Sequence, residues 1–439
     1  MQIENQYFSE TDASDTKAKG QSSFYPWIIW GLGAAFFLAE YFARIAPGIM
    51  VPELMSAFRV NALTLGSLSA IFYTAYLTMQ MPVGTLVDKF GPHRLLTITA
   101  AICALGCFLF ASADYLGLAQ VARFMMGFGA AFAFVGTLKL ATIWFPPSRF
   151  GLLSGLTQAL GMVGGAVAAG PLAVLVHQIG WRHTMWLIGI ILLLLAILIG
   201  LVVRDQPKKS SVTFSSRTDK KLKFWDAFSA VLRNPQSWLN ATYAGLVYAP
   251  TAAFAELWGV TYLARVYDID RTVAANAVSC IFIGLAIGCP VGGWISDKIR
   301  RRRPVMLVAA VVSLIFMSCA LYIPNLSVTA LFILLFFYGI ANSGFATSYA
   351  LAGEINPPRV AGTSLGFANM ASVLVGACFQ PIIGWFLDLQ WDGQMLNEAP
   401  LYSVEAFRHA MMALPVCLFL GVIVTFFVKE TYCRSAENK

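Results

Sequence analysis

Charge is scarce in this sequence. Charged residues make up 12% of its 439 residues, whereas about 25% is typical of soluble globular chains. Hydrophobic residues make up 58%, against roughly 45–50% in such chains. So few charges cannot cover a surface that faces water, and much of the exposed surface must therefore face lipid. The same figures exclude a disordered chain, a collagen and a coiled coil.

Metal-binding and cofactor patterns are also missing. The four histidines are scattered, and no Cys-x-x-Cys pair or Cys/His cluster has zinc spacing. Of the eight cysteines, all but Cys433 lie inside apolar runs, where cysteine behaves as a small hydrophobic residue. No nucleotide-binding glycine-rich loop and no nucleophile–base arrangement is visible. The sequence thus predicts no metal, no cofactor, no disulfide framework and no enzymatic activity.

The excess of basic residues does not indicate nucleic acid. The net charge is +8, but the basic residues fall in short clusters between apolar runs and form no basic face with interleaved aromatics. The first 25 residues are polar and contain acids. We therefore predict no cleavable signal peptide, and the first membrane span acts as its own signal.

Long apolar runs predict a helical membrane protein. About 20 apolar residues cross the hydrocarbon core of a bilayer, and twelve runs reach this length, while the alternation typical of a barrel strand is missing. We predict an all-α integral membrane protein with twelve transmembrane helices in two six-helix bundles. The bundles are 27–203 and 237–428, the basic linker is 204–236, and the tails are 1–26 and 429–439. The predicted spans are 27–50, 64–87, 95–113, 116–144, 151–176, 184–203, 237–260, 274–295, 305–323, 327–350, 362–386 and 406–428.

The distribution of lysine and arginine predicts the orientation. Of the 30 residues, 22 fall in the segments on the side of the termini and the linker, five on the other side and three inside spans. Because cytoplasmic loops carry the excess of positive charge, both termini are expected in the cytoplasm.

The two halves repeat each other. GTLVDKFGPHR (84–94) follows the second span, and GWISDKIRRRR (293–303) follows the eighth. FPPSRFGLLSG (145–155) and NPPRVAGTSLG (356–366) form a second pair, after spans 4 and 10. Repeated halves with a site between them are typical of secondary transporters.

These residues resemble the major facilitator superfamily. Its loop motif, Gly-x-x-x-Asp-basic-x-Gly-basic-basic, is matched after span 2, although a Pro-His pair replaces the expected basic pair. A second motif, Arg-x-x-x-Gly-x-Gly, is matched in span 4 by Arg123, Gly127 and Gly129. The resemblance implies transport by alternating access, with the loop motif and its copy in the second half as gates. The matching gate residues are Gly84, Asp88, Lys89, Gly91, Arg94, Gly293, Asp297 and Lys298.

Physical reasoning gives the first loop motif the same role. Gly84 would let helices approach closely. Asp88 would act as a latch that one conformation holds and another releases. A simple topology anchor is the alternative. Arg300 to Arg303 are interpreted as orientation and lipid-headgroup charges.

Ionisable residues inside spans are costly and need a reason. Glu40 and Arg44, one helical turn apart in span 1, form either an internal ion pair or a substrate site in which Arg44 clamps an anion. Tyr41 and Arg44 form a Tyr-x-x-Arg pattern that resembles the anion-handling branches of the superfamily. We predict Arg44, Tyr41, Tyr76, Gln80 and Lys139 as substrate-binding residues. The alternatives are helix-contact roles for Tyr76 and Gln80 and snorkelling to the interface for Lys139.

Proton coupling is predicted at Glu256, Glu40 and Arg123. Glu256 is the first choice because apolar surroundings favour the neutral form of a carboxyl group, so that it can take up and release a proton. The alternative is a hydrogen-bonded acid or a group at the interface. For Arg123 the role is implied by the resemblance to the span 4 motif of the superfamily, and the alternatives are structural bonding and snorkelling.

The predicted function is proton-coupled uptake of a small polar or anionic nutrient, such as an amino acid or organic acid. APGIMVPELM (46–55) and LKLATIWFP (138–146) look most like a bacterial branch that takes up amino acids inside host vacuoles. Transport of a siderophore or sugar phosphate, drug or metabolite efflux, and a non-transporting receptor remain alternatives. Protons and the lipid bilayer are the expected partners, the protein is expected to act as a monomer, and a bacterial inner membrane is the expected location.

Overall fold

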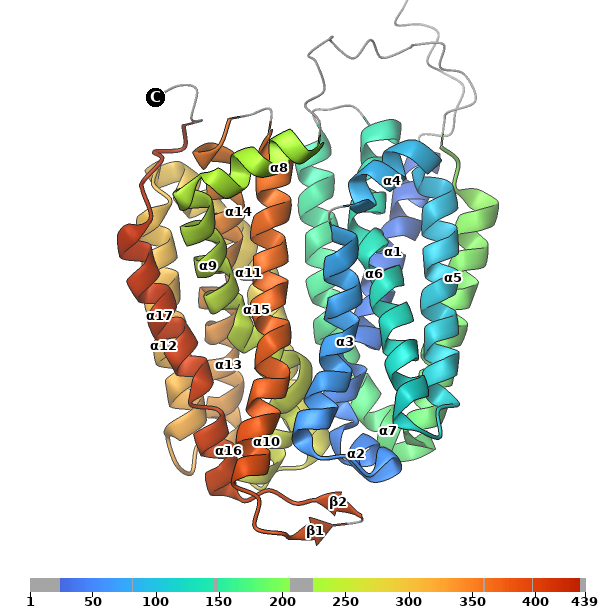
Figure 1. Cartoon of the computed structure of the whole chain (residues 1–439), viewed down its shortest axis with the longest axis vertical. Coiled ribbons are helices and arrows are strands. Elements are labelled where there is room, and N and C mark those ends of the chain that lie inside the picture. The colour runs from blue at the N-terminus through green and yellow to red at the C-terminus, as the bar shows by residue number, and fades with distance from the viewer. Residues whose placement is uncertain are drawn as a thin grey trace, which may run out of the picture.

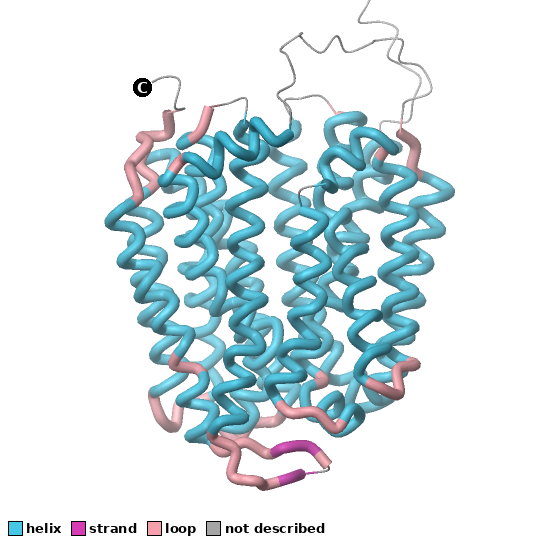
Figure 2. The backbone as a smooth tube through the Cα atoms, viewed as in Figure 1, coloured by secondary structure: helices cyan, strands magenta, loops and turns pink. Residues whose placement is uncertain are grey.

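The computed structural model describes residues 24–80, 82–145, 149–205, 224–357, 360–396 and 398–434. Over these ranges it is a bundle of long helices with one small hairpin (Figures 1 and 2). Ten of the described helices are long and apolar enough to cross a membrane. The predicted all-α membrane fold is thereby confirmed.

Two of the predicted spans merge into a single helix. α7 (Phe150–Val202) changes direction at Gly180, where φ is 80°, a conformation that favours glycine. Another span is divided, because α9, η2 and α10 follow one another without a break. The count of twelve crossings is reached if α7 counts as two crossings and the run of α9, η2 and α10 counts as one. That count stays a prediction.

Each half of the chain contributes one group of helices. The first half holds α1 (Tyr25–Ile49), α2 (Val51–Phe58), α3 (Ala62–Gln80), α4 (Pro82–Phe90), α5 (Pro92–Ala111), α6 (Leu116–Trp144) and α7. The second half holds α8 (Phe224–Arg233), α9 (Pro235–Pro250), η2 (Thr251–Trp258), α10 (Gly259–Val266), α11 (Arg271–Ile299), α12 (Arg303–Tyr322), α13 (Val328–Asn342), η3 (Ser343–Ala346), α14 (Thr347–Ile355), α15 (Ala361–Leu389), β1 (Met395–Leu396), β2 (Ala399–Pro400), α16 (Val404–Ala410) and α17 (Ala413–Phe427). β1 and β2 pair antiparallel.

The segment predicted as a linker contains a helix. Residues 206–223 lie outside the described residues, but α8 runs across one end of the bundle (Figure 1). Its Val231 is fully buried against Val360 and Phe367. The segment 204–236 was predicted as a linker between the bundles. For α8 this is wrong, because this helix packs against the second half.

Glycines set the closest helix contacts. A Cβ on Gly127 of α6 would lie 1.9 Å from the carbonyl oxygen of Phe72 in α3, and one on Gly66 would lie 2.6 Å from the carbonyl oxygen of Gln380 in α15. Around Gly84, by contrast, no described atom lies within 4 Å of a Cβ position. The close approach predicted at Gly84 is thus wrong in this conformation, and it occurs at Gly66 and Gly127 instead.

The two ends of the bundle differ in how the halves are joined. We name them the linker end, where α4 and α8 lie, and the hairpin end, where β1 and β2 lie (Figure 1). At the hairpin end Arg271 of α11 forms a two-bonded ion pair with Glu53 of α2. Toward the linker end, the hydrogen bond between the halves among described residues runs from Asn369 to Gln80, at 3.2 Å.

At the hairpin end, Asp388 joins α15 of the second half to α3 of the first half. Its carboxylate accepts hydrogen bonds from the backbone N–H groups of Ala62 (3.1 Å) and Leu63 (2.8 Å), the first residues of α3. Tyr402 donates to the same carboxylate and accepts from the Ala62 N–H at 3.0 Å. An anion at a helix N-terminus satisfies free N–H groups and interacts favourably with the helix dipole. The end of α15 therefore caps a helix of the other half.

We expect Asp388→Asn to loosen the hairpin end. The change removes the charge and one acceptor, and an N-terminal cap contributes about 0.5–2 kcal/mol. Spin labels in place of Ser112 and Thr329, exposed residues of the two halves at the hairpin end, should report longer and broader distances than in the wild type. Asp392→Asn is the control, because Asp392 lies in the neighbouring loop and accepts only from the nearby Gln394 N–H among described residues. Unchanged distances in Asp388→Asn would show that this cap does not hold the halves together.

Candidate functional site

The centre of the candidate site is an ion pair inside α1. Arg44 Nη2 lies 2.6 Å from Glu40 Oε1, and Arg44 Nε lies 3.2 Å from Glu40 Oε2. Glu40 is fully buried and Arg44 is 5% exposed. One turn of helix separates them, so both point the same way. Of the two alternatives for Glu40 and Arg44, the structure thus shows the internal ion pair, joined by two hydrogen bonds.

Aromatic rings surround the guanidinium. The Arg44 Cζ lies 4.4 Å from the ring centre of Tyr41, 5.2 Å from that of Tyr76 and 5.5 Å from that of Phe72. A cation within about 6 Å of an aromatic ring is attracted to its face. Tyr41 and Tyr76 are brought together as the sequence predicts. Phe72 was not predicted, although it precedes Tyr76 by one helical turn in the same span.

The second half contributes a buried carboxyl group. Glu256 accepts a hydrogen bond from the Tyr248 hydroxyl at 3.0 Å, and its other oxygen has no hydrogen-bond partner among described residues. It lies in η2, a π-helical segment, and such segments are frequent at functional sites. A Cβ on Gly48 would lie only 2.5 Å from the Glu256 carbonyl oxygen, so η2 lies against α1. Gly48 follows Arg44 by one helical turn in α1. The ion pair and Glu256 therefore share one buried region at the contact of the two halves.

Gln80 lies at the side of this region nearer the linker end. Its side-chain oxygen accepts from Asn369, which in turn accepts from the Tyr349 hydroxyl at 3.0 Å. Tyr76 and Gln80 are one turn apart in α3. Asn369 was not predicted, because no pattern in the sequence distinguishes it from other polar residues in the spans.

Arg123 is a structural tie in this conformation. Its Nη1 donates to the Ala43 carbonyl at 2.8 Å, and its Nη2 donates to the Ser69 carbonyl at 3.4 Å. The side chain is 1% exposed, so the snorkelling alternative is wrong. Arg123 thus links α6 to α1 and α3. Its partner on α1, Ala43, is the residue directly before Arg44.

Lys139 lies apart from Arg123 on the same helix. Sixteen residues of α-helix correspond to about 24 Å, and Lys139 is half-buried in α6 toward the linker end. Since Arg123 contacts the residue next to Arg44, the structure does not bring Lys139 to the ion pair.

The first loop motif is held by a residue that was not predicted. The Asp205 carboxylate accepts from the His93 N–H at 2.8 Å. Gly91, with φ of 82°, leaves room for that carboxylate, since a Cβ there would lie 2.3 Å from it. Lys89 and Arg94 are exposed. The side chain of Asp88 lies outside the described residues, and its latch role stays a prediction.

The copy of the motif in the second half forms an ion network. Arg302 Nη1 lies 2.6 Å from Asp297 Oδ1, and Arg302 Nη2 lies 2.7 Å from Glu354 Oε1. Glu430 accepts from the backbone N–H groups of Arg302 and Arg303 at 2.8 and 2.9 Å. Arg302 is therefore buried and paired, and the interpretation of it as a headgroup charge is wrong.

Two other residues of that copy make few contacts. The Lys298 ammonium lies 4.8 Å from the ring centre of Trp294. Gly293 has no described atom within 4 Å of a Cβ position, like Gly84 in the first half. Both glycines of the motifs thus face open space at the linker end.

Comparison with known proteins identifies the family of this chain. The family model described as Major Facilitator Superfamily matches residues 32–381 and 257–436. A probable sulfoacetate transporter of Cupriavidus necator, SauU, is 24% identical over 380 residues, which are 82% of this chain and 87% of that protein. The membrane sensor protein UhpC of Escherichia coli is 26% identical over 417 residues, 88% of this chain and 90% of that protein.

A solved structure shares the fold. A bacterial homologue of the human lysosomal transporter Spinster, in an inward-facing and unoccupied conformation, matches with a TM-score of 0.78 at 18% identity, over 93% of this chain and 98% of that one. The resemblance found in the motifs is thus confirmed by a family model over most of the chain, by relatives and by the fold. This chain belongs to the major facilitator superfamily of membrane transporters.

Proposed function

We propose that this chain is a proton-coupled uptake transporter for a small organic anion that carries a carboxylate, sulfonate or phosphate group. The observation that carries the proposal is the buried Arg44 guanidinium at the contact of the two halves. It donates two hydrogen bonds to the Glu40 carboxylate and is surrounded by aromatic rings. A site at the contact of repeated halves is the usual arrangement in secondary transporters.

The chemistry of Arg44 favours an anionic substrate. A guanidinium presents a rigid planar fork that matches a carboxylate or phosphate with two parallel hydrogen bonds. Glu40 occupies that fork here, so an anionic group of substrate would take its place. The similarity to a probable sulfoacetate transporter supports this class of substrate. An amino acid would use the same fork through its carboxylate.

Replacement of Glu40 by substrate at Arg44 also provides proton coupling. When substrate displaces Glu40 from Arg44, Glu40 is left buried without its partner, and an unpaired buried charge is costly. Glu40 would then take a proton, so that one proton enters with one anion. Glu256 is the second candidate carrier, because it is buried with one hydrogen-bond donor.

A sensor without transport is the second candidate function. It is favoured by the similarity to UhpC, which is as extensive as that to SauU. Purified protein in liposomes separates the two, because a transporter moves substrate across the membrane and a sensor only binds it.

We expect Arg44→Lys to weaken binding of an organic anion strongly. Lysine keeps a positive charge beside Glu40 but lacks the planar fork, and loss of a buried charge-assisted contact costs about 2–5 kcal/mol. Binding of sulfoacetate, a hexose phosphate and an amino acid would be measured by calorimetry on purified protein. Arg204→Lys, at an exposed arginine of the linker end, should bind like the wild type. If Arg44→Lys and Arg44→Ala fold and bind with unchanged affinity, Arg44 does not hold the substrate.

We expect Glu40→Gln to remove the pH dependence of binding. In the wild type, lowering the pH protonates Glu40 and frees Arg44, so affinity for the anion should rise by up to about tenfold per pH unit for one linked proton. In Glu40→Gln the affinity should be high at every pH. Exchange of substrate in liposomes should persist, while accumulation driven by a pH gradient should be lost.

Two further variants make this test decisive. Glu405→Gln, at an exposed carboxyl group of α16, should leave both measurements unchanged. If Glu256→Gln loses proton-driven accumulation while Glu40→Gln keeps it, Glu256 is the carrier and the exchange at Arg44 is not the coupling step.

A further inference from the structure

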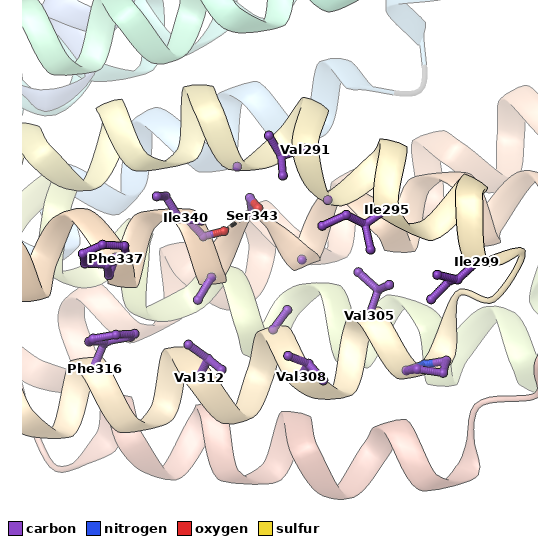
Figure 3. A pocket seen from close by; sticks show the side chains of 16 residues that line it. Val291, Ile295, Ile299, Val305, Val308, Val312, Phe316, Phe337, Ile340 and Ser343 are labelled. Atoms are coloured by element: carbon purple, nitrogen blue, oxygen red, sulfur yellow. Dashed lines mark hydrogen bonds between the residues drawn. The ribbon is translucent and has the colours of Figure 1, made fainter.

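A groove lies on the second half of the chain, away from the candidate site. It has a volume of about 360 Å³, with α11 and α12 as its walls and the end of α13 with η3 as its floor (Figure 3). α11 and α12 both pack along α13 but contact each other little. Small residues, among them Gly292, Ala309 and Gly344, keep the space between them open.

The lining of the groove suits an apolar chain. Its large side chains are aliphatic or aromatic, and Val291, Ile295, Ile299 and Val308 are 40–60% exposed. The one hydroxyl in the lining, that of Ser343, is already donated to the Ile340 carbonyl at 2.6 Å. A polar ligand would find no free hydrogen-bond donor among the side chains of the lining, and only the Ser343 oxygen as an acceptor.

One end of the groove is basic. Ile299 and Pro304 line the groove, and the turn formed by residues 300–303 joins α11 to α12 between them (Figure 3). Arg302 is neutralised by Asp297 and Glu354. Arg300 and Arg301 are exposed, and neither forms an ion pair among the described residues. The Arg301 guanidinium lies 6.0 Å from the ring centre of Tyr432. Two unneutralised cations therefore lie where the apolar groove ends.

We propose that this groove is a binding site for an anionic phospholipid, with one acyl chain in the groove and the phosphate at Arg300 and Arg301. Such a lipid matches both features of the site, because its acyl chain fits the apolar groove and its phosphate pairs with the arginines. The site is independent of the proposed function, because among the described residues no hydrogen bond or ion pair joins its lining to Arg44, Glu40 or Glu256.

The test measures lipid binding to the purified full chain by native mass spectrometry. The probes are phosphatidylglycerol and phosphatidylcholine with the same acyl chains, and we expect a preference for phosphatidylglycerol. Arg300→Gln with Arg301→Gln should weaken phosphatidylglycerol binding roughly 25-fold, about fivefold for each basic residue near an anionic headgroup. The matched control is Arg149→Gln with Arg204→Gln, which removes two exposed arginines from the linker end of the other half.

A second variant tests the groove itself. Val308→Trp fills the groove from its exposed wall and should also abolish the preference, whereas Val121→Trp, on an exposed face of α6, should not. If only the arginine variant has an effect, or if glycerol phosphate competes as well as the lipid, the arginines bind a phosphate without the groove and the proposal fails. Equal binding of the two lipids by the wild type would also overturn it.

Discussion

Each charge buried in this membrane protein has to be stabilised by other groups of the protein, and this constraint organises the structure. The hydrocarbon core offers no water to a charged side chain. Three arginines meet the requirement in three ways. Arg44 pairs with a carboxylate, Arg123 donates to backbone carbonyls, and Arg302 joins two acids at the linker end.

These three solutions suit different tasks. A tie to backbone carbonyls, as at Arg123, cannot be exchanged for a ligand without loosening α1 and α3. A pair with a side-chain carboxylate can be exchanged, because the carboxylate can take a proton and leave. Of these three arginines, Arg44 therefore fits the proposed role in substrate binding best, because its one partner is a titratable side chain and the pair is buried.

The contacts between the halves concentrate at one end. The cap that Asp388 makes on α3 and the ion pair of Arg271 with Glu53 join the hairpin end. Gly84 and Gly293 face open space at the other end. Asp388 ends the segment PIIGWFLD, whose spacing of Pro, Gly and Asp matches that of PVGGWISD at 290–297. The same short pattern thus supplies an acid at both ends of the bundle.

The class of fold, the repeated halves, the family and the charged residues inside the membrane can be read from the amino-acid sequence. Apolar runs and costly charges are local features, so no knowledge of packing is needed to find them. The partners of each charge come from the packing of the helices, as do the bonds of Arg123 to backbone carbonyls and the distance of Lys139 from the ion pair. The same holds for the contacts of Asp205, Phe72, Tyr248 and Asn369. Those contacts join residues far apart in the chain, and their partners follow from how helices lie against one another. The spacing of residues along the chain does not show how the helices are arranged.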